Sequence, residues 1–356
     1  MILVTKPFFP ERAEYQKYLD QIWDNKWVTN NGPMVKELES SIGRNLKTTK
    51  PKLVSNGTLA LQIAIKALGL KGKIITTPFS YVATTSSIVW EGCEPVFADI
   101  DSDTLNICPK SIEALMDDNV VGIVATHCFG NACDIDRIDQ ISRQHNIPVI
   151  YDAAHCFGTL YKGESIFNFG DLSICSLHAT KLMHSVEGGL IFSKDLQMDD
   201  KISYLRNFGH DGYEHFQGLG VNGKNSEFHA AMGLCVLHHF SSLSKKRIEQ
   251  CEIYDELLLE LNVNRPTVSV DCEPNRSYYP IIFESEELCE RAKYSLEEQG
   301  IMARRYFYPP LNTLSYVKEQ STPVASDISS RILCLPLYHD LEYTQQKMIC
   351  KILLND

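Results

Sequence analysis

Two residues between positions 147 and 193 could together carry out chemistry. Asp152 directly follows the apolar run Ile147–Tyr151, and Lys181 follows a second apolar run, Leu172–Leu177. Short β-branched runs of this kind are typical of buried strands in a parallel sheet. Ligands of open α/β sheets gather at the carboxyl ends of the strands. We therefore expect Asp152 and Lys181 to face one cleft.

These two side chains suit one kind of cofactor chemistry. A lysine that loses its proton near neutral pH can form an imine with a carbonyl group. A carboxylate opposite can keep a pyridinium nitrogen protonated, so that the ring takes up carbanion electrons, which is what a protein contributes to pyridoxal phosphate chemistry. The spacing alone does not distinguish such a site from ordinary strand-end residues, because these are common.

A strand, a tight turn and a helix near residue 55 form a second feature that could bind a ligand. The strand is expected at Lys52–Ser55, the turn at Asn56–Thr58 and an apolar helix at Leu59–Leu68. Such a unit exposes backbone N–H groups at a positive helix end, where a phosphate can bind. Capping of the helix by Thr58 is the alternative explanation.

Short apolar runs and helical patterns alternate through the first 240 residues, which predicts a mostly parallel sheet with helices on both faces. A long helix is expected from Phe228 onward, and an α+β unit follows it. We expect a large domain at 1–240 and a smaller domain at 241–356. The other expected elements are strands at Ile74–Thr77, Pro95–Ile100, Val120–Thr126, Tyr278–Phe283 and Met302–Tyr306, and helices at Glu11–Asp24, Pro109–Met116, Ile135–His145 and Glu286–Glu298.

The composition excludes several classes of protein. A net charge of −11 with no long basic block argues against nucleic-acid binding. The N-terminus lacks a signal-peptide core and no apolar run approaches membrane-spanning length, so we expect a cytoplasmic protein without a membrane partner. The twelve cysteines are scattered through expected strands and helices, which indicates reduced, buried thiols. His127, Cys128 and Cys133 match no standard zinc spacing, and we expect no metal site.

The segment Gly218–Gly223 matches the dinucleotide-binding pattern G-x-G-x-x-G. That pattern needs a preceding strand and an acidic residue about twenty positions later. The preceding residues, HDGYEHFQ, are no strand, and the acid is missing. We therefore do not expect a nicotinamide or flavin nucleotide here.

Three segments together resemble the DegT/DnrJ family of nucleotide-sugar aminotransferases. They are Asp152–His155, Ser176–Lys181 and Glu187–Gly189, and further matches extend from Asn25 to Tyr338. The resemblance implies the fold-type I aspartate aminotransferase architecture, with a mostly parallel mixed sheet in a large domain and a smaller α+β C-terminal domain. It also implies that pyridoxal 5'-phosphate is the cofactor.

The resemblance assigns roles to particular positions. Lys181 would be the Schiff-base lysine and Asp152 the partner of the pyridine nitrogen, while Asn222 would reach the phosphate of the neighbouring subunit in a homodimer. Lys224 replaces the usual Arg, and Asn312 occupies a position where many members have His. The expected cofactor-binding residues are Gly57, Thr58, Tyr81, Asp152, His155, Ser176, Lys181 and Asn222, and the expected substrate contacts are Thr29, Asn30, His178, Lys224 and Tyr308.

The residues alone leave ordinary explanations open. Tyr81 could equally be a core aromatic residue. Thr29, Asn30 and Asn222 could equally be turn residues.

The implied activity is transfer of an amino group from L-glutamate to a keto sugar nucleotide. The pattern around Lys181 is most similar to family members that act on 4-keto sugars, with dTDP-4-keto-6-deoxy-D-glucose as the expected substrate and O-antigen or another surface polysaccharide as the destination. Alternatives are a C3-specific enzyme, one that uses UDP or GDP sugars, a sugar dehydrase and a non-catalytic regulator. Lys181 argues against the dehydrase, in which His replaces this lysine, and together with Asp152 it argues against the regulator.

Overall fold

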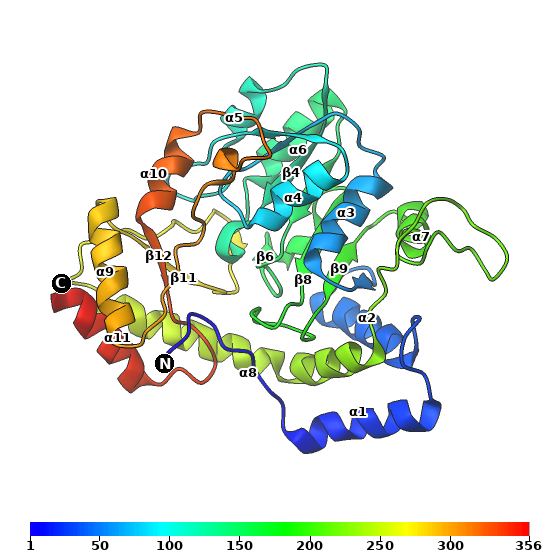
Figure 1. The fold of residues 1–356 in the computed structure, drawn as a ribbon, viewed down its shortest axis with the longest axis horizontal. Coiled ribbons are helices and arrows are strands. Elements are labelled where there is room, and N and C mark those ends of the chain that lie inside the picture. The colour runs from blue at the N-terminus through cyan, green and yellow to red at the C-terminus, as the bar shows by residue number, and fades with distance from the viewer. Residues whose placement is uncertain (356) are drawn as a thin grey trace.

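The computed structural model describes residues 1–355, and its centre is a seven-stranded sheet (Figure 1). The strand order is β1-β9-β8-β5-β4-β2-β3. β9 pairs antiparallel with both β1 and β8, and the other neighbours are parallel. This confirms the predicted mostly parallel mixed sheet. Its strands are β1 (Lys52–Val54), β2 (Lys73–Thr76), β3 (Glu94–Phe97), β4 (Val120–Thr126), β5 (Val149–Asp152), β8 (Leu172–Ser176) and β9 (Gly189–Phe192).

Apolar side chains cover both faces of this sheet. Along β5, Ile150 belongs to the core on one face, whereas Val149 and Tyr151 belong to the core on the other. Such alternation is the two-residue period of a strand buried on both sides. The helices that flank the sheet are α2 (Pro33–Leu46), α3 (Gly57–Ala67), α4 (Val82–Trp90), α5 (Pro109–Ala114), α6 (Ile135–His145) and α7 (Leu196–Leu205).

Short elements fill the connections around the sheet. A three-stranded sheet with the order β10-β6-β7 joins residues near position 160 to the later part of the chain. The strands of this small sheet are β6 (Leu160–Tyr161), β7 (Glu164–Ser165) and β10 (Cys272–Glu273). The other short elements are the 3-10 helices η1 (Cys128–Gly130), η2 (Ile166–Asn168) and η3 (Leu311–Thr313).

One continuous helix, α8 (Glu227–Leu257), links the two parts of the chain (Figure 1). Its first half contributes Phe240 to the core below the large sheet, and its second half contributes Tyr254 to a separate C-terminal core. The expected domain boundary at residue 240 therefore falls inside a helix, and its position stays a prediction. α1 (Arg12–Asn25) packs along α8.

The C-terminal part is an α+β unit. Its two strands, β11 (Tyr279–Ile282) and β12 (Ile332–Leu335), pair antiparallel. Its helices are α9 (Glu286–Glu298), α10 (Pro323–Arg331) and α11 (Tyr343–Asn355).

The strand predicted at Met302–Tyr306 is wrong. Arg304 in this run bridges Cys334, whereas Ile301, just before the run, bridges Ile2. A strand needs one partner along its length, and these isolated bridges do not provide it.

All twelve cysteines are free, and ten of them are buried, as predicted. No helix in residues 1–355 combines the length and the apolar character needed to cross a membrane.

Candidate active site

Asp152 is the last residue of β5, and its carboxylate lies buried at the carboxyl end of the sheet. Thr84 Oγ1 donates to Asp152 Oδ2 at 2.7 Å, and the backbone N–H of Ala154 donates to Oδ1 at 3.2 Å. Ser80 joins the hydroxyl of Thr84 to that of Thr126, so a chain of buried hydroxyl groups supports the carboxylate. These contacts fix the direction in which Asp152 points.

Burial raises the pKa of Asp152, because it disfavours the charged form. The hydrogen bonds from Thr84 and Ala154 and the positive charge of Lys181 act in the opposite direction. A bound cationic group would stabilise the carboxylate further, since an opposite charge nearby favours the ionised form.

Lys181 lies in the loop between β8 and β9, whose antiparallel pairing brings the two ends of this loop together. The backbone N–H of Lys181 donates to His178 O at 2.9 Å. The side chain points to Tyr278, and Nζ donates to its hydroxyl oxygen at 3.1 Å. Lys181, His155, Ser176 and Tyr278 line one cavity.

Tyr278 comes from the C-terminal part of the chain and is held by aromatic rings. Its ring packs edge-on against Phe129 and Tyr306, and it lies 4.8 Å from the ring of His155. The adjacent residue, Ser277, donates from its hydroxyl to His155 O at 2.6 Å. The hydroxyl that contacts Lys181 is thus positioned by both parts of the molecule.

The side chain of Asn275 binds the backbone around His155. Asn275 Nδ2 donates to His155 O at 2.8 Å and to Phe157 O at 2.9 Å. Asn275 Oδ1 accepts from the backbone N–H of Ser277 at 3.1 Å. This network fastens the segment that carries Tyr278 to the segment that follows Asp152.

The ring of His155 is buried and stacks parallel to Phe307 and Phe129. Burial lowers the pKa of His155 well below its usual value, and the charge of Lys181 adds to this effect. The imidazole is therefore neutral at neutral pH. Its buried Nδ1 atom has no hydrogen-bond partner within residues 1–355. A buried polar atom without a partner is costly, which points to a group that the polypeptide itself does not supply.

The start of α3 lies next to the end of β8. A Cβ atom at Gly57 would lie 3.1 Å from the Cβ atom of Ser176, so the two segments approach closely because residue 57 is glycine. The side chain of Asn56 caps the helix by accepting from the N–H of Leu59, so the alternative explanation of Thr58 as the cap does not hold. The N–H groups of the first helical turn have no intrahelical partner, which leaves those of Gly57 and Thr58 for an anion.

The other predicted residues do not line this cavity in the described part of the chain. Tyr81 is exposed and directly precedes α4. Thr29, Asn30 and His178 are also exposed. Tyr308 is exposed, and the guanidinium of Arg305 lies over its ring at a distance of 3.7 Å from the ring centre.

Asn222 and Lys224 lie in the segment before α8, where Lys224 Nζ donates to Asn222 Oδ1 at 2.8 Å. Asn222 is exposed and forms a single bridge with Asn207. Gly218–Gly223 contains no strand and no helix.

A family model described as "DegT/DnrJ/EryC1/StrS aminotransferase family" matches residues 10–354. The chain belongs to this family. It is therefore an aminotransferase, and pyridoxal 5'-phosphate is its cofactor.

Similar proteins cover nearly the whole chain. A protein from Shigella dysenteriae named dTDP-4-amino-4,6-dideoxy-D-glucose transaminase is 40% identical over 347 residues, which cover 96% of this chain and 95% of that protein. A protein of the same name from Escherichia coli is 35% identical, with 99% and 98% covered. The crystal structure of DesI in the presence of its TDP-sugar product has a TM-score of 0.94 and is 29% identical, with 99% and 92% covered.

The site fits pyridoxal phosphate on this structure's own features. Asp152 supplies a buried carboxylate, Lys181 supplies an amine that lines a cavity with His155, and His155 supplies an unpartnered ring nitrogen. The close approach of Gly57 to Ser176 places backbone N–H groups and a hydroxyl where they can hold a phosphate. The donors thus match both the ring and the phosphate of the cofactor.

Sequence reasoning missed the residues that position this site. Thr84 donates to Asp152, and Tyr278 accepts from Lys181. The side chains of Asn275 and Ser277 both bind the backbone carbonyl of His155. Tyr278 is 97 positions from Lys181. No local spacing joins residues that far apart, so only the fold reveals the contact.

Proposed function

We propose that this family member transfers an amino group from L-glutamate to C4 of dTDP-4-keto-6-deoxy-D-glucose. The single observation that carries the catalytic part is the cavity in which Lys181 lies with its amine held by Tyr278, close to the buried carboxylate of Asp152. The names of the Shigella and Escherichia relatives, at 40% and 35% identity, support the sugar and its nucleotide.

Pyridoxal phosphate supplies the carbonyl group that accepts the amine and the ring that takes up carbanion electrons. Asp152 would hold a negative charge beside the ring nitrogen, and the hydroxyl of Thr84 keeps its carboxylate in place. Lys181 Nζ moves a proton to and from the α-carbon of the amino donor, acting as base and then as acid. His155 stays neutral and offers Nδ1 to a polar group of the ligand.

Gly57, Thr58 and Ser176 are proposed to bind the phosphate, and Tyr81 to stack on the ring. For Gly57 and Ser176 the support is their close approach. We assign Thr29, Asn30, His178, Lys224 and Tyr308 to the sugar nucleotide, whose negative charge favours a nearby lysine. The support for this assignment is the resemblance of their segments to the family pattern.

We also propose that the active unit is a homodimer whose sites are built from both chains. Asn222 is exposed in the single chain and does not line its own Lys181 cavity, which fits a contact made to the partner's phosphate. In a twofold dimer each chain then gives and receives this residue.

Mixing two inactive variants tests the shared site. A hybrid of Lys181→Ala with Asn222→Ala has one site with both defects and one with neither. After subunit exchange about half of the dimers are hybrids, so the mixture should regain about a quarter of wild-type activity. Demonstrated exchange without recovery, or an active monomer, would refute the dimer proposal.

The reaction is proposed to serve surface polysaccharide such as O-antigen and to run in the cytoplasm. The twelve free thiols fit a reducing compartment.

Product analysis by NMR tests the substrate. The enzyme is offered dTDP-, UDP- and GDP-linked 4-keto sugars and a dTDP-linked 3-keto sugar, each with L-glutamate or L-glutamine. The expected product carries nitrogen at C4 of the dTDP sugar in the gluco configuration. Faster conversion of a 3-keto sugar or of another nucleotide would replace the proposed substrate with that one.

A further inference from the structure

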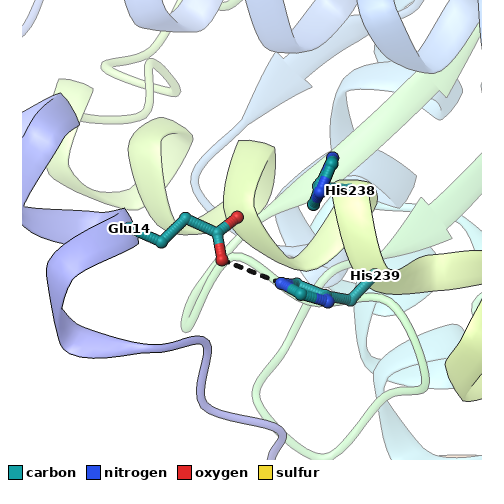
Figure 2. Close-up of side chains that lie close together, drawn as sticks. All are labelled: Glu14, His238 and His239. Atoms are coloured by element: carbon teal, nitrogen blue, oxygen red, sulfur yellow. Dashed lines mark hydrogen bonds and ion pairs between the residues drawn. The ribbon is translucent and has the colours of Figure 1, made fainter.

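Three potential metal ligands from two helices meet where α1 packs on α8, and none of them lines the Lys181 cavity (Figure 2). Glu14 lies in the first turn of α1, and His238 and His239 lie within α8. Their ligand atoms all lie within 4.8 Å of one another. His239 Nε2 and Glu14 Oε2 are already 2.8 Å apart. The fold therefore brings nitrogen and oxygen donors together from residues that are 225 positions apart in the sequence.

We propose that Glu14, His238 and His239 bind a divalent cation of the zinc class and thereby clamp α1 to α8. Two imidazoles and one carboxylate are ligands that zinc takes, with a water molecule in the fourth position. Nickel and copper are the other cations that imidazole suits.

The geometry needs only a small adjustment. Zinc ligands at about 2.0–2.1 Å in a tetrahedral arrangement lie roughly 3.4 Å from one another. The widest separation in the cluster, at most 4.8 Å, must then close by about 1.4 Å. His238 is exposed, so rotation of its side chain can supply this movement.

A simple ion pair explains two of the three residues but not the third. The contact of His239 with Glu14 leaves the side chain of His238 without a hydrogen bond within the described residues 1–355, and its ring meets that of His239 edge-on at 5.0 Å. Phe8 also packs against the His239 ring, at 5.2 Å between ring centres. His239 and Glu14 are thus held in place, and His238 is free to complete the site.

The clamp has a consequence for the N-terminal segment. α1 ends at Asn25, just before the exposed residues Thr29 and Asn30. A cation that binds only the folded contact between α1 and α8 stabilises that contact by mass action. Binding would therefore hold the start of this segment against the body of the protein.

Isothermal titration with zinc chloride tests the proposal on the full-length, cofactor-loaded protein without a purification tag. The test variant is His238→Ala, which leaves the ion pair of Glu14 with His239 intact. The matched control is His215→Ala, because His215 Nδ1 lies 3.7 Å from Asp211 Oδ2 at another exposed histidine–carboxylate pair outside the cluster. Thermal midpoints measured in EDTA check that each variant folds.

The wild type and His215→Ala should each bind one zinc ion per chain with the same Kd. His238→Ala should bind at least about tenfold more weakly, because even residues behind the metal ligands are worth tenfold or more in affinity. No saturable binding in the wild type, or a weakening below about threefold in His238→Ala, would overturn the proposal. If His238→Ala does not fold, His238→Gln gives the same comparison.

Discussion

Removing the Tyr278 hydroxyl should slow the proton transfers of Lys181 without disturbing the site. In Tyr278→Phe the ring can keep its contacts with Phe129, His155 and Tyr306. The variant loses only the oxygen that accepts from Lys181 Nζ at 3.1 Å. The amine then loses the one side-chain hydrogen bond that directs it within residues 1–355.

The size of the effect follows from that bond. A hydrogen bond to a charged group contributes about 1.5–3 kcal/mol. If the bond acts on the reacting position of Lys181, kcat should fall between about tenfold and a hundredfold, since every 1.4 kcal/mol is a factor of ten. KM for the sugar nucleotide should stay within about threefold, because the substrate contacts are unchanged.

Steady-state kinetics with L-glutamate deuterated at the α-carbon separates positioning from packing. If Tyr278 directs the proton transfer, this step becomes more rate-limiting in Tyr278→Phe, and the isotope effect on kcat should increase over the wild type. A variant that is merely loosened would lose thermal stability and leave the isotope effect unchanged. A kcat within twofold of wild type, or an unchanged isotope effect, would refute the role of the hydroxyl.

Three further changes test the surroundings of the site. Asp152→Asn should retain the cofactor, as its absorbance shows, but lose several orders of magnitude in kcat, and near-normal turnover would disprove the assignment. Arg206→Met removes the guanidinium that lies 2.6 Å from the buried carboxylate of Glu39. The free energy of unfolding, measured in urea, should fall by about 3–5 kcal/mol, and a fall below about 1 kcal/mol would contradict the importance of this ion pair. Burial lowers the pKa of His127 to about 3, so stability is lost as pH falls below about 6.5, by about 1.4 kcal/mol per pH unit. His127→Asn keeps an acceptor for the Cys133 N–H. Between about pH 6 and pH 4 its free energy of unfolding in urea should fall less steeply with pH than that of the wild type, and an equal slope would contradict the role of His127.

The sheet and its helices could be predicted because their signals are local. β4 and α6 have the predicted bounds, and β5 and β8 lie within two residues of theirs. A buried strand and an amphipathic helix each leave a periodic pattern in their own residues. The strand predicted at Met302–Tyr306 is wrong because a strand depends on a continuous partner along its length, which local sequence does not show.

The placement of the proposed reactive pair could also be predicted, because Asp152 and Lys181 come at or after the carboxyl ends of two neighbouring parallel strands. Their catalytic roles stay a prediction. The residues that hold this pair in place could not be predicted. Thr84 is 68 positions from Asp152. The cap of α3 went to Asn56 rather than Thr58, since the helix begins two residues earlier than its apolar pattern. Contacts of this kind depend on how the elements pack, and no spacing within the chain encodes them.

Borohydride reduction followed by peptide mapping tests the central claim most directly. The site was built around the amine of Lys181, which lies in one cavity with His155 and Ser176 and close to the carboxylate of Asp152. Reduction of the yellow, cofactor-loaded protein should attach pyridoxal phosphate to the peptide that contains Lys181, at about one equivalent per chain. Label on a different lysine, or no label on any peptide, would contradict the account.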